Sequence, residues 1–252
     1  METFVNESSI IRRIWGTTDI TLFIFAGAAA EFALNKQVDW LYFTGKLPAD
    51  PIGRMFSTIQ YAQQIIFNNE KKALDSIAHI NDIHHSVESA RHRKIPATSY
   101  KDVLFMLIHY SVTSFELAER KLTPGEKDEV VDTFKRMGIL MHMEDLPGDY
   151  LTWMTVYDMH LQWNLENSSF TKDLFKQYRK HLGAFRYFIL LEIQRLLAPA
   201  QVKDLLKLGK PVIAHRFIWL YKLLRKLGLH NPLIEAMVPK KFRAQARAMR
   251  HL

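Results

Sequence analysis

The sequence predicts an all-α protein, a single-domain helical bundle that spans residues 1–252. Apolar residues recur at the three- and four-residue spacing of helices along most of the chain, and no segment alternates with the two-residue period of a strand. Helix-capping and helix-breaking residues divide this pattern into segments of ordinary helix length. The chain shows no repeat and no linker, and its 252 residues are enough for one large core.

The first long helix is expected over residues 19–34, after a cluster of potential N-cap residues. Small residues at 26–30 would let another backbone or a flat ligand approach closely. Glu31 stands near the end of this apolar run. It marks either the point where the helix reaches the surface or a buried carboxylate, whose raised pKa would suit a catalytic base. We expect residues 37–43 to continue this helix or to form a short separate one, and residues 44–48 to form a loop.

The second long helix is expected over residues 51–67. Asp50 is a typical N-cap residue, and Pro51 fits the first turn because the N–H that it lacks has no partner there. Arg54 and Thr58 are four residues apart, so they share one helical face and can address the same ligand.

An arginine near the core needs an anionic partner, because an unpaired buried charge is costly. A protein carboxylate such as that of Glu31 or Asp82 would serve Arg54 in this way. Thr58 has a simpler alternative to ligand binding, since its hydroxyl can donate a hydrogen bond to the carbonyl of Arg54.

A third helix is expected over residues 68–89. Its inward stripe has three- and four-residue spacing and consists of Ala73, Ile77, Ile80, His84 and Val87. His84 thus occupies a position where an aliphatic residue is expected, whereas His85 lies about 100° away on a more polar face. His84 is either a neutral core histidine satisfied by its neighbours, or a ligand that donates an imidazole nitrogen to a metal in an apolar pocket.

His109 lies in a fourth expected helix, residues 100–121, which Ser99 would cap. This helix is apolar on nearly every side from 103 to 112, so we expect it to be buried in the bundle. His109 is either a second residue of the pocket or a core histidine bonded to a backbone carbonyl.

The second half of the chain is expected to continue as helices. A capping box at residues 123–126 opens a helix that ends near residue 143, and an aromatic-rich helix follows from 149 or 150. A long helix over 170–197 contains Gly183, at which we expect a bend.

Three more helices are expected over residues 199–208, 212–227 and 239–250. In the middle one, apolar residues should face the core and basic residues the solvent: Phe217, Leu220, Leu223 and Leu224 inward, and Arg216, Lys222, Arg225 and Lys226 outward. Gly228 ends that helix.

Composition excludes several functional classes. Cysteine is absent, which excludes disulfides, thiolate-ligated haem, iron–sulfur clusters and cysteine-based zinc sites. The net charge is +8, and twelve Lys and Arg residues follow residue 202 against two acids, Asp204 and Glu235. No nucleic-acid-binding motif is visible, so we expect no nucleic acid partner. The basic helical segment 239–252 is either a solvated face or a peripheral contact with an anionic membrane.

Targeting signals are not visible in the sequence. Residues 1–13 contain acids and lack the apolar stretch of a signal peptide. The most apolar stretch, residues 20–34, is shorter than a bilayer-spanning helix. We therefore expect a core helix there and a cytoplasmic protein, with any membrane association at its periphery.

Three short segments carry a resemblance to a known family. Residues 50–58 have the pattern Asp-Pro-x-x-Arg-x-x-x-Thr, residues 84–87 His-x-x-Val, and residues 107–109 are Leu-Ile-His. In order and spacing they resemble the oxygenase family that includes the latex clearing proteins (rubber oxygenases) and the MpaB-type oxygenases, where the third segment is Trp-Val-His. The resemblance covers roughly residues 10–129. The family's Gln-x-Ala-His-Pro segment maps onto residues 31–35, so its His and Pro are missing here.

The resemblance implies an all-helical fold with a globin-like core and a b-type haem (heme b). It implies that His84 is the proximal iron ligand and that Arg54 and Thr58 lie beside the haem, with a haem propionate as the anion for Arg54. His109 becomes a further candidate for cofactor binding. Arg54 and Thr58, together with Glu31, become the candidate catalytic residues.

The same resemblance implies a haem-dependent oxygenase, which uses O2 to cleave or oxidise a carbon–carbon double bond of a small apolar substrate such as an isoprenoid chain. Two other classes stay open. A non-catalytic haem or lipid-binding protein would share His84 without activating O2. An all-α interaction protein would have lost the cofactor, as the missing His-Pro pair allows.

Overall fold

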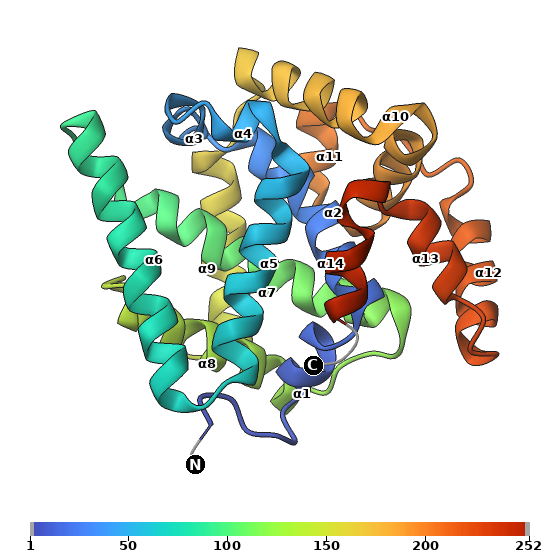
Figure 1. The fold of residues 1–252 in the computed structure, drawn as a ribbon, viewed down its shortest axis with the longest axis horizontal. Coiled ribbons are helices and arrows are strands. Elements are labelled where there is room, and N and C mark those ends of the chain that lie inside the picture. The colour runs from blue at the N-terminus through green and yellow to red at the C-terminus, as the bar shows by residue number, and fades with distance from the viewer. Residues whose placement is uncertain (1–2, 250–252) are drawn as a thin grey trace.

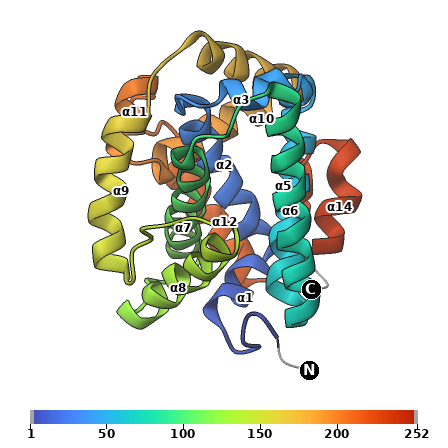
Figure 2. The same cartoon turned by 90° about the vertical axis from the view of Figure 1, so that its left-hand side faces the viewer.

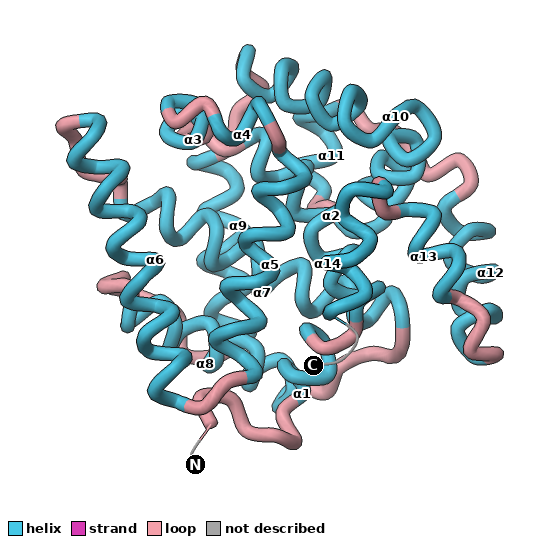
Figure 3. Tube along the Cα trace, viewed as in Figure 1, coloured by secondary structure: helices cyan, strands magenta, loops and turns pink. Residues whose placement is uncertain are grey.

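The computed structural model of the chain describes residues 3–249, and every regular element in this range is a helix (Figure 1; Figure 3). The predicted all-α class is therefore confirmed. In chain order the helices are α1 Ile10–Trp15, α2 Thr18–Leu34, α3 Asp39–Phe43, α4 Lys46–Ala49, α5 Pro51–Phe67, α6 Glu70–Arg91, α7 Ala97–Ala118, α8 Pro124–Leu140, α9 Tyr150–Asn164, α10 Ser169–Leu197, α11 Ala200–Leu206, α12 Ala214–Lys226, α13 Asn231–Met237, the 3-10 helix η1 Lys240–Phe242 and α14 Arg243–Ala248.

The central helix of the bundle is α2, against which both α7 and α10 pack (Figure 1; Figure 2). Most of its residues are buried, as expected for a helix that is apolar on every side. Gly27 permits the close approach of α7, because a Cβ at this position would lie 2.4 Å from the ring of Tyr110. No helix in the described range is both long and apolar enough to cross a bilayer.

Helices α5 and α6 form an antiparallel pair joined by a short turn (Figure 1). The carboxylate of Asp50 accepts a hydrogen bond from the N–H of Gly53 at 3.0 Å, and Pro51 lies in the first turn of α5. At the start of α6, the side chain of Asn69 accepts from the N–H of Lys72 at 3.0 Å. The start of α5 follows the sequence prediction and α6 begins slightly later than predicted, because side-chain caps determine both starts locally.

Two further local predictions are confirmed in the second half. The capping box formed by Thr123 and Glu126 opens α8, with both reciprocal hydrogen bonds present. Gly183 bends α10, where its φ of 74° and ψ of 166° interrupt the helix. Such a backbone conformation is accessible almost only to glycine.

Some helix boundaries differ from the prediction. Residues 44–48, expected as a loop, contain most of α4, whose Pro48 is tolerated because a first helical turn needs no N–H there. The short helices α1 and α13 were not predicted. Ser99 does not cap α7, because Pro96 at the N-cap position starts this helix earlier. The last predicted helix is divided into η1 and α14, and its expected end at Arg250 lies outside the described residues.

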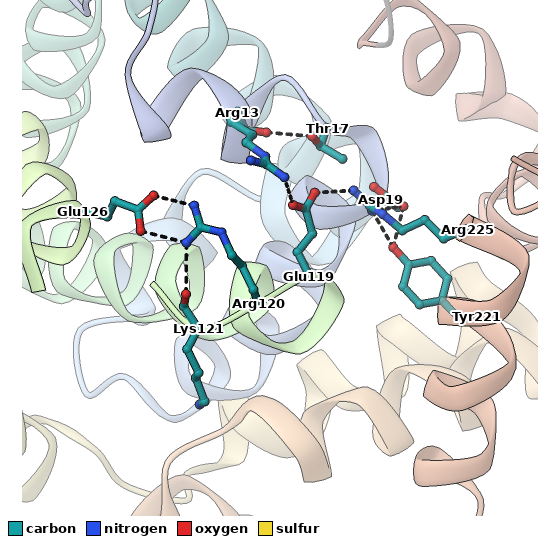
Figure 4. A network of polar contacts seen from close by, with 9 residues as sticks. All are labelled: Arg13, Thr17, Asp19, Glu119, Arg120, Lys121, Glu126, Tyr221 and Arg225. Atoms are coloured by element: carbon teal, nitrogen blue, oxygen red, sulfur yellow. Dashed lines mark hydrogen bonds and ion pairs between the residues drawn. The ribbon is translucent and has the colours of Figure 1, made fainter. Parts of the chain in front are cut away.

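Buried charges, rather than an apolar stripe, orient α12. Asp19 of α2 accepts hydrogen bonds from Tyr221 and Arg225, each at 2.5 Å, and Arg225 also reaches Glu119 at 2.6 Å (Figure 4). Arg13 completes the group by pairing with Glu119. The predicted outward position of Arg225 is therefore wrong, since a cation with two buried or half-buried carboxylate partners faces inward.

Part of the predicted inward side of α12 is correspondingly turned outward, whereas Phe217 and Leu224 are half-buried, as that pattern predicts. Leu220 and Leu223, which were predicted to face the core, are 44% and 42% exposed. The start of the helix is held by Glu192 of α10, whose carboxylate accepts the N–H groups of Val212 and Ile213 at 3.0 and 2.7 Å. These contacts join segments far apart in sequence, which is why the local pattern did not predict them.

Candidate functional site

A largely apolar cavity of about 490 Å³ lies within the bundle, among helices from both halves of the chain. Its walls come from α2, α5, α6 and α7 on one side and from α10, α12 and α13 on the other. The volume falls within the range of pockets that enclose small organic ligands. Three of the five predicted site residues, Arg54, Thr58 and His84, line this cavity together.

His84 lies half-buried on α6, in the predicted inward stripe, and its neighbour His85 is exposed as expected. Neither ring nitrogen of His84 has a hydrogen-bond partner among residues 3–249, and Nδ1 is buried. The ring meets that of Tyr100 edge-on, with 5.1 Å between the centroids. The nitrogens of a core histidine are normally satisfied, so the buried Nδ1 of this imidazole is left available to a ligand.

The charge state of His84 follows from its surroundings. Burial lowers the pKa of His84 below its usual 6.5, and the nearby positive charge of Arg54 lowers it further, against a weaker opposite effect of Glu88. The imidazole is therefore neutral at pH 7, and a neutral imidazole is the form that can donate a lone pair to a metal.

Arg54 reaches the same cavity from α5. It forms no ion pair with any carboxylate in the described part of the chain, so neither Glu31 nor Asp82 serves as its partner. The hydroxyl of Thr58 donates to the carbonyl of Arg54 at 3.1 Å, which is the local alternative considered for this residue. The cavity wall therefore carries a cation available to an anionic ligand group.

Glu31 does not line the cavity. It is buried behind the wall, where it accepts a hydrogen bond from the hydroxyl of Tyr157 at 2.6 Å and also interacts with Tyr110. Burial raises the pKa of Glu31 to about 8, despite the opposing effect of these two hydroxyls. The prediction of a buried carboxylate is thus confirmed, and the alternative of a surface position is wrong.

His109 lies beside this carboxylate cluster rather than on the cavity wall. Its Nε2 is 3.2 Å from the carbonyl oxygen of Leu197, and its ring contacts those of Tyr110 and Tyr157. Burial lowers the pKa of His109 to about 4. These contacts match the core-histidine alternative.

Sequence reasoning missed the far wall of the cavity. That wall includes Phe217 of α12, Ile234 and Met237 of α13, and Arg186 of α10, whose guanidinium is bonded to the carbonyl of Ala236 at 2.8 Å. The helical pattern predicted that Phe217 faces the core but not that it lines a pocket, and no local motif marks the other three residues. Only long-range packing brings all four to the cavity.

The side chains of the described residues offer few ligands for a bare metal ion. Within residues 3–249 no group of three or more His, Asp or Glu side chains is placed to hold a bare metal ion. A haem iron requires only one protein ligand, because the porphyrin supplies four nitrogens. One unpartnered imidazole, one unpaired guanidinium and apolar walls therefore fit a haem better than any ion bound by protein groups alone.

The sequence also matches the model of a known protein family. The family model described as "ER-bound oxygenase mpaB/B'/Rubber oxygenase, catalytic domain" matches residues 13–251. No match was found among curated proteins or among solved structures. Because the matched region covers nearly the whole sequence, the chain belongs to the mpaB/rubber oxygenase family of oxygenases.

Proposed function

We propose that this family member is a haem b-dependent oxygenase, which uses O2 to cleave or oxidise a carbon–carbon double bond of a small apolar substrate such as an isoprenoid chain. The observation that carries the proposal is the imidazole of His84, which lacks hydrogen-bond partners in the described range and lies on the wall of a large apolar cavity. A haem, when bound, supplies an iron centre at which O2 can be activated.

His84 would hold the iron through one ring nitrogen. Its lowered pKa supports this role, because the ring does not need to lose a proton before it binds metal at neutral pH. Arg54 would balance an acidic propionate arm, since its guanidinium lies on the same wall without a carboxylate partner.

The remaining wall residues would bind and enclose the substrate. Thr58 shapes the wall next to Arg54, because its hydroxyl is already committed to a backbone carbonyl. Apolar side chains such as Ile80, Val87 and Leu104 would exclude water and hold an apolar chain by contact alone. Glu31 and His109 lie behind this wall, so we propose no substrate contact for either of them.

Titration of the purified protein with haemin, followed by its absorption spectrum, tests the proposal. We expect a Soret band that saturates near one haem per chain. His84→Ala should weaken haem binding at least tenfold, equivalent to about 1.4 kcal/mol, because the iron loses its protein ligand. His85→Ala is the matched control: this exposed histidine lies on the same helix and should leave binding unchanged.

Two outcomes would contradict the proposal: no Soret band with the folded protein, or a band that is the same in His84→Ala. The ferrous spectrum separates the alternative of a non-catalytic haem or lipid-binding protein. A six-coordinate low-spin iron, with both axial positions filled by protein, would favour that alternative over O2 chemistry.

A further inference from the structure

Helix α12 lies at the outer edge of the molecule (Figure 1). This helix and its two ends expose several large apolar side chains. We call this set the α12 face, and it consists of Val212, Ile213, Trp219, Leu220, Leu223, Leu227 and Leu229. Trp219 alone is 67% exposed. Contiguous exposed apolar surface of this kind marks interaction sites in folded proteins.

The charged residues of the chain segment that forms the α12 face are all of one sign. Between Asp204 and Glu235 the chain has no acidic residue, and it has six basic residues: Lys207, Lys210, Arg216, Lys222, Arg225 and Lys226. Only Arg225 in this group forms ion pairs within the described residues, with Asp19 and Glu119. The other cations therefore remain available to an anionic partner.

A second helix shows that apolar exposure alone does not define this surface. Helix α9 also exposes large apolar residues, among them Leu151 and Trp163, which are 71% and 74% exposed. In the chain segment 149–166, which contains that helix, the charged residues are all acidic: Asp149, Asp158 and Glu166. The two helices thus combine similar apolar exposure with opposite charge, and they provide a matched pair for experiment.

We propose that the α12 face docks onto the surface of a lipid bilayer that contains anionic lipids. Trp219, Leu223 and Leu227 follow four-residue spacing on one side of a helix about 20 Å long, as an in-plane interfacial helix requires. Their side chains would enter the boundary of the acyl chains. Arg216 and Lys226, near the two ends of this stripe, would face the anionic headgroups.

Charge argues against a second copy of this chain as the occupant. A symmetric dimer places the same patch of both subunits in contact. Two α12 faces would bring their unpaired cations together without any acid in the segment to balance them, and the repulsion would oppose association. Anionic headgroups supply the missing charge, and acyl chains accept the apolar side chains.

The α12 face is distinct from the basic segment 239–252 considered from sequence. It also adjoins the proposed site, because Phe217 on the other side of α12 lines the apolar cavity. Docking would therefore hold the cavity wall close to a source of apolar molecules. Docking does not require haem, so a failure of either proposal leaves the other standing.

Cosedimentation with vesicles of phosphatidylcholine and phosphatidylserine tests the docking. The protein should bind these vesicles, and binding should weaken with added salt and with phosphatidylcholine alone. Trp219→Ser with Leu223→Ser should weaken partitioning at least tenfold, whereas Leu151→Ser with Trp163→Ser should change it less than twofold. Circular dichroism of each variant checks that it is folded.

Tryptophan fluorescence gives a second measurement that needs no disruptive change. Besides Trp163 and Trp219, the protein has three tryptophans, which are at most 5% exposed: Trp15, Trp40 and Trp153. The Trp163→Phe variant therefore reports on Trp219. If the Trp219 side chain enters the bilayer, vesicle binding should shift its emission to shorter wavelength, and brominated lipids should quench it.

Several results would overturn the proposal. One is absence of binding to the mixed vesicles. Another is an equal loss of vesicle binding in the Trp219/Leu223 and Leu151/Trp163 variants, and a third is the absence of Trp219 quenching by brominated lipids. Loss of binding in Lys240→Glu alone would assign the contact to the C-terminal segment instead. A dimer in sedimentation velocity that dissociates on changing Trp219 and Leu223 would show that a second copy covers the face.

Discussion

Glu31 and His109 show how burial shifts the pKa of two groups that contact the same two tyrosines, Tyr110 and Tyr157. Burial raises the pKa of Glu31 from 4.5 to about 8 and lowers the pKa of His109 from 6.5 to about 4. In both cases the folded protein favours the uncharged form. Folding therefore makes Glu31 take up a proton between pH 4.5 and 8, and makes His109 release one between pH 4 and 6.5.

These shifts predict the pH dependence of stability. Between pH 6.5 and 8 folded Glu31 binds more protons than unfolded Glu31, so the free energy of unfolding must fall as pH rises. Over this interval Glu31 should contribute a loss of roughly 1.5 kcal/mol. Urea unfolding of the wild type and of Glu31→Gln across the interval measures the difference, because the amide cannot titrate.

An exposed carboxylate provides the control for that comparison. Asp75→Asn on α6 removes an exposed acid and should leave the pH dependence of the wild type unchanged. If the Glu31→Gln protein kept the same decline as the wild type, the carboxylate would be ionised in the folded protein and its assigned pKa would be wrong.

At the scale of the helices, glycines determine where two elements bend or approach each other. Gly183 has a positive φ with no atom near its missing Cβ, so only its backbone conformation requires glycine. Gly125, in the first turn of α8, has an ordinary φ and equally open space. Because an added Cβ would meet no atom at either position, a comparison of the two isolates the effect of the backbone conformation.

We expect Gly183→Ala to lower the free energy of unfolding by about 1–3 kcal/mol, because an L-residue is strained in this region of φ and ψ. Gly125→Ala should leave it unchanged or raise it by about 0.5–1 kcal/mol, since alanine favours the helix and restricts the unfolded chain. Chemical denaturation measures both. Equal stability of the two variants would mean that α10 does not need the bend at Gly183.

Capping side chains predicted some helix starts from sequence, but two short helices, α1 and α13, were missed. The starts of α5 and α8 carry capping side chains with a proline in the first turn, so their positions follow from neighbouring residues. The short helix α13 has no side-chain cap. The orientation of α12 depends on Asp19, about two hundred residues earlier, which no periodicity within α12 can reveal.

The candidate site shows the same division. The four-residue spacing of Arg54 and Thr58 was enough to predict that they share one face of α5. That His84 of α6 lines the same pocket was expected only from the family resemblance. The outcome for Glu31 and His109 depended on which neighbours surround them. Both residues contact Tyr157 of α9, far along the chain, and together these side chains form a buried cluster apart from the cavity.

At the scale of the whole molecule, the C-terminal helices complete the cavity that the first half of the chain begins. Phe242 of η1 stacks on Phe56 of α5, with ring centroids 5.0 Å apart, and Lys241 pairs with Asp50 at 2.7 Å. These contacts fix the end of the described chain against the helix that carries Arg54. The site is therefore a property of the entire fold, in agreement with a family match that covers residues 13–251.

The central claim, that His84 is the iron ligand of a haem in this cavity, is tested most directly by chemical rescue. In His84→Gly, the haem-loaded protein should lose the spectrum of a histidine-ligated iron, and added imidazole should restore it by occupying the space of the missing ring. The His85→Gly protein should keep the wild-type haem spectrum, and added imidazole should not change it. A His84→Gly protein with an unchanged haem spectrum before imidazole is added would contradict the claim.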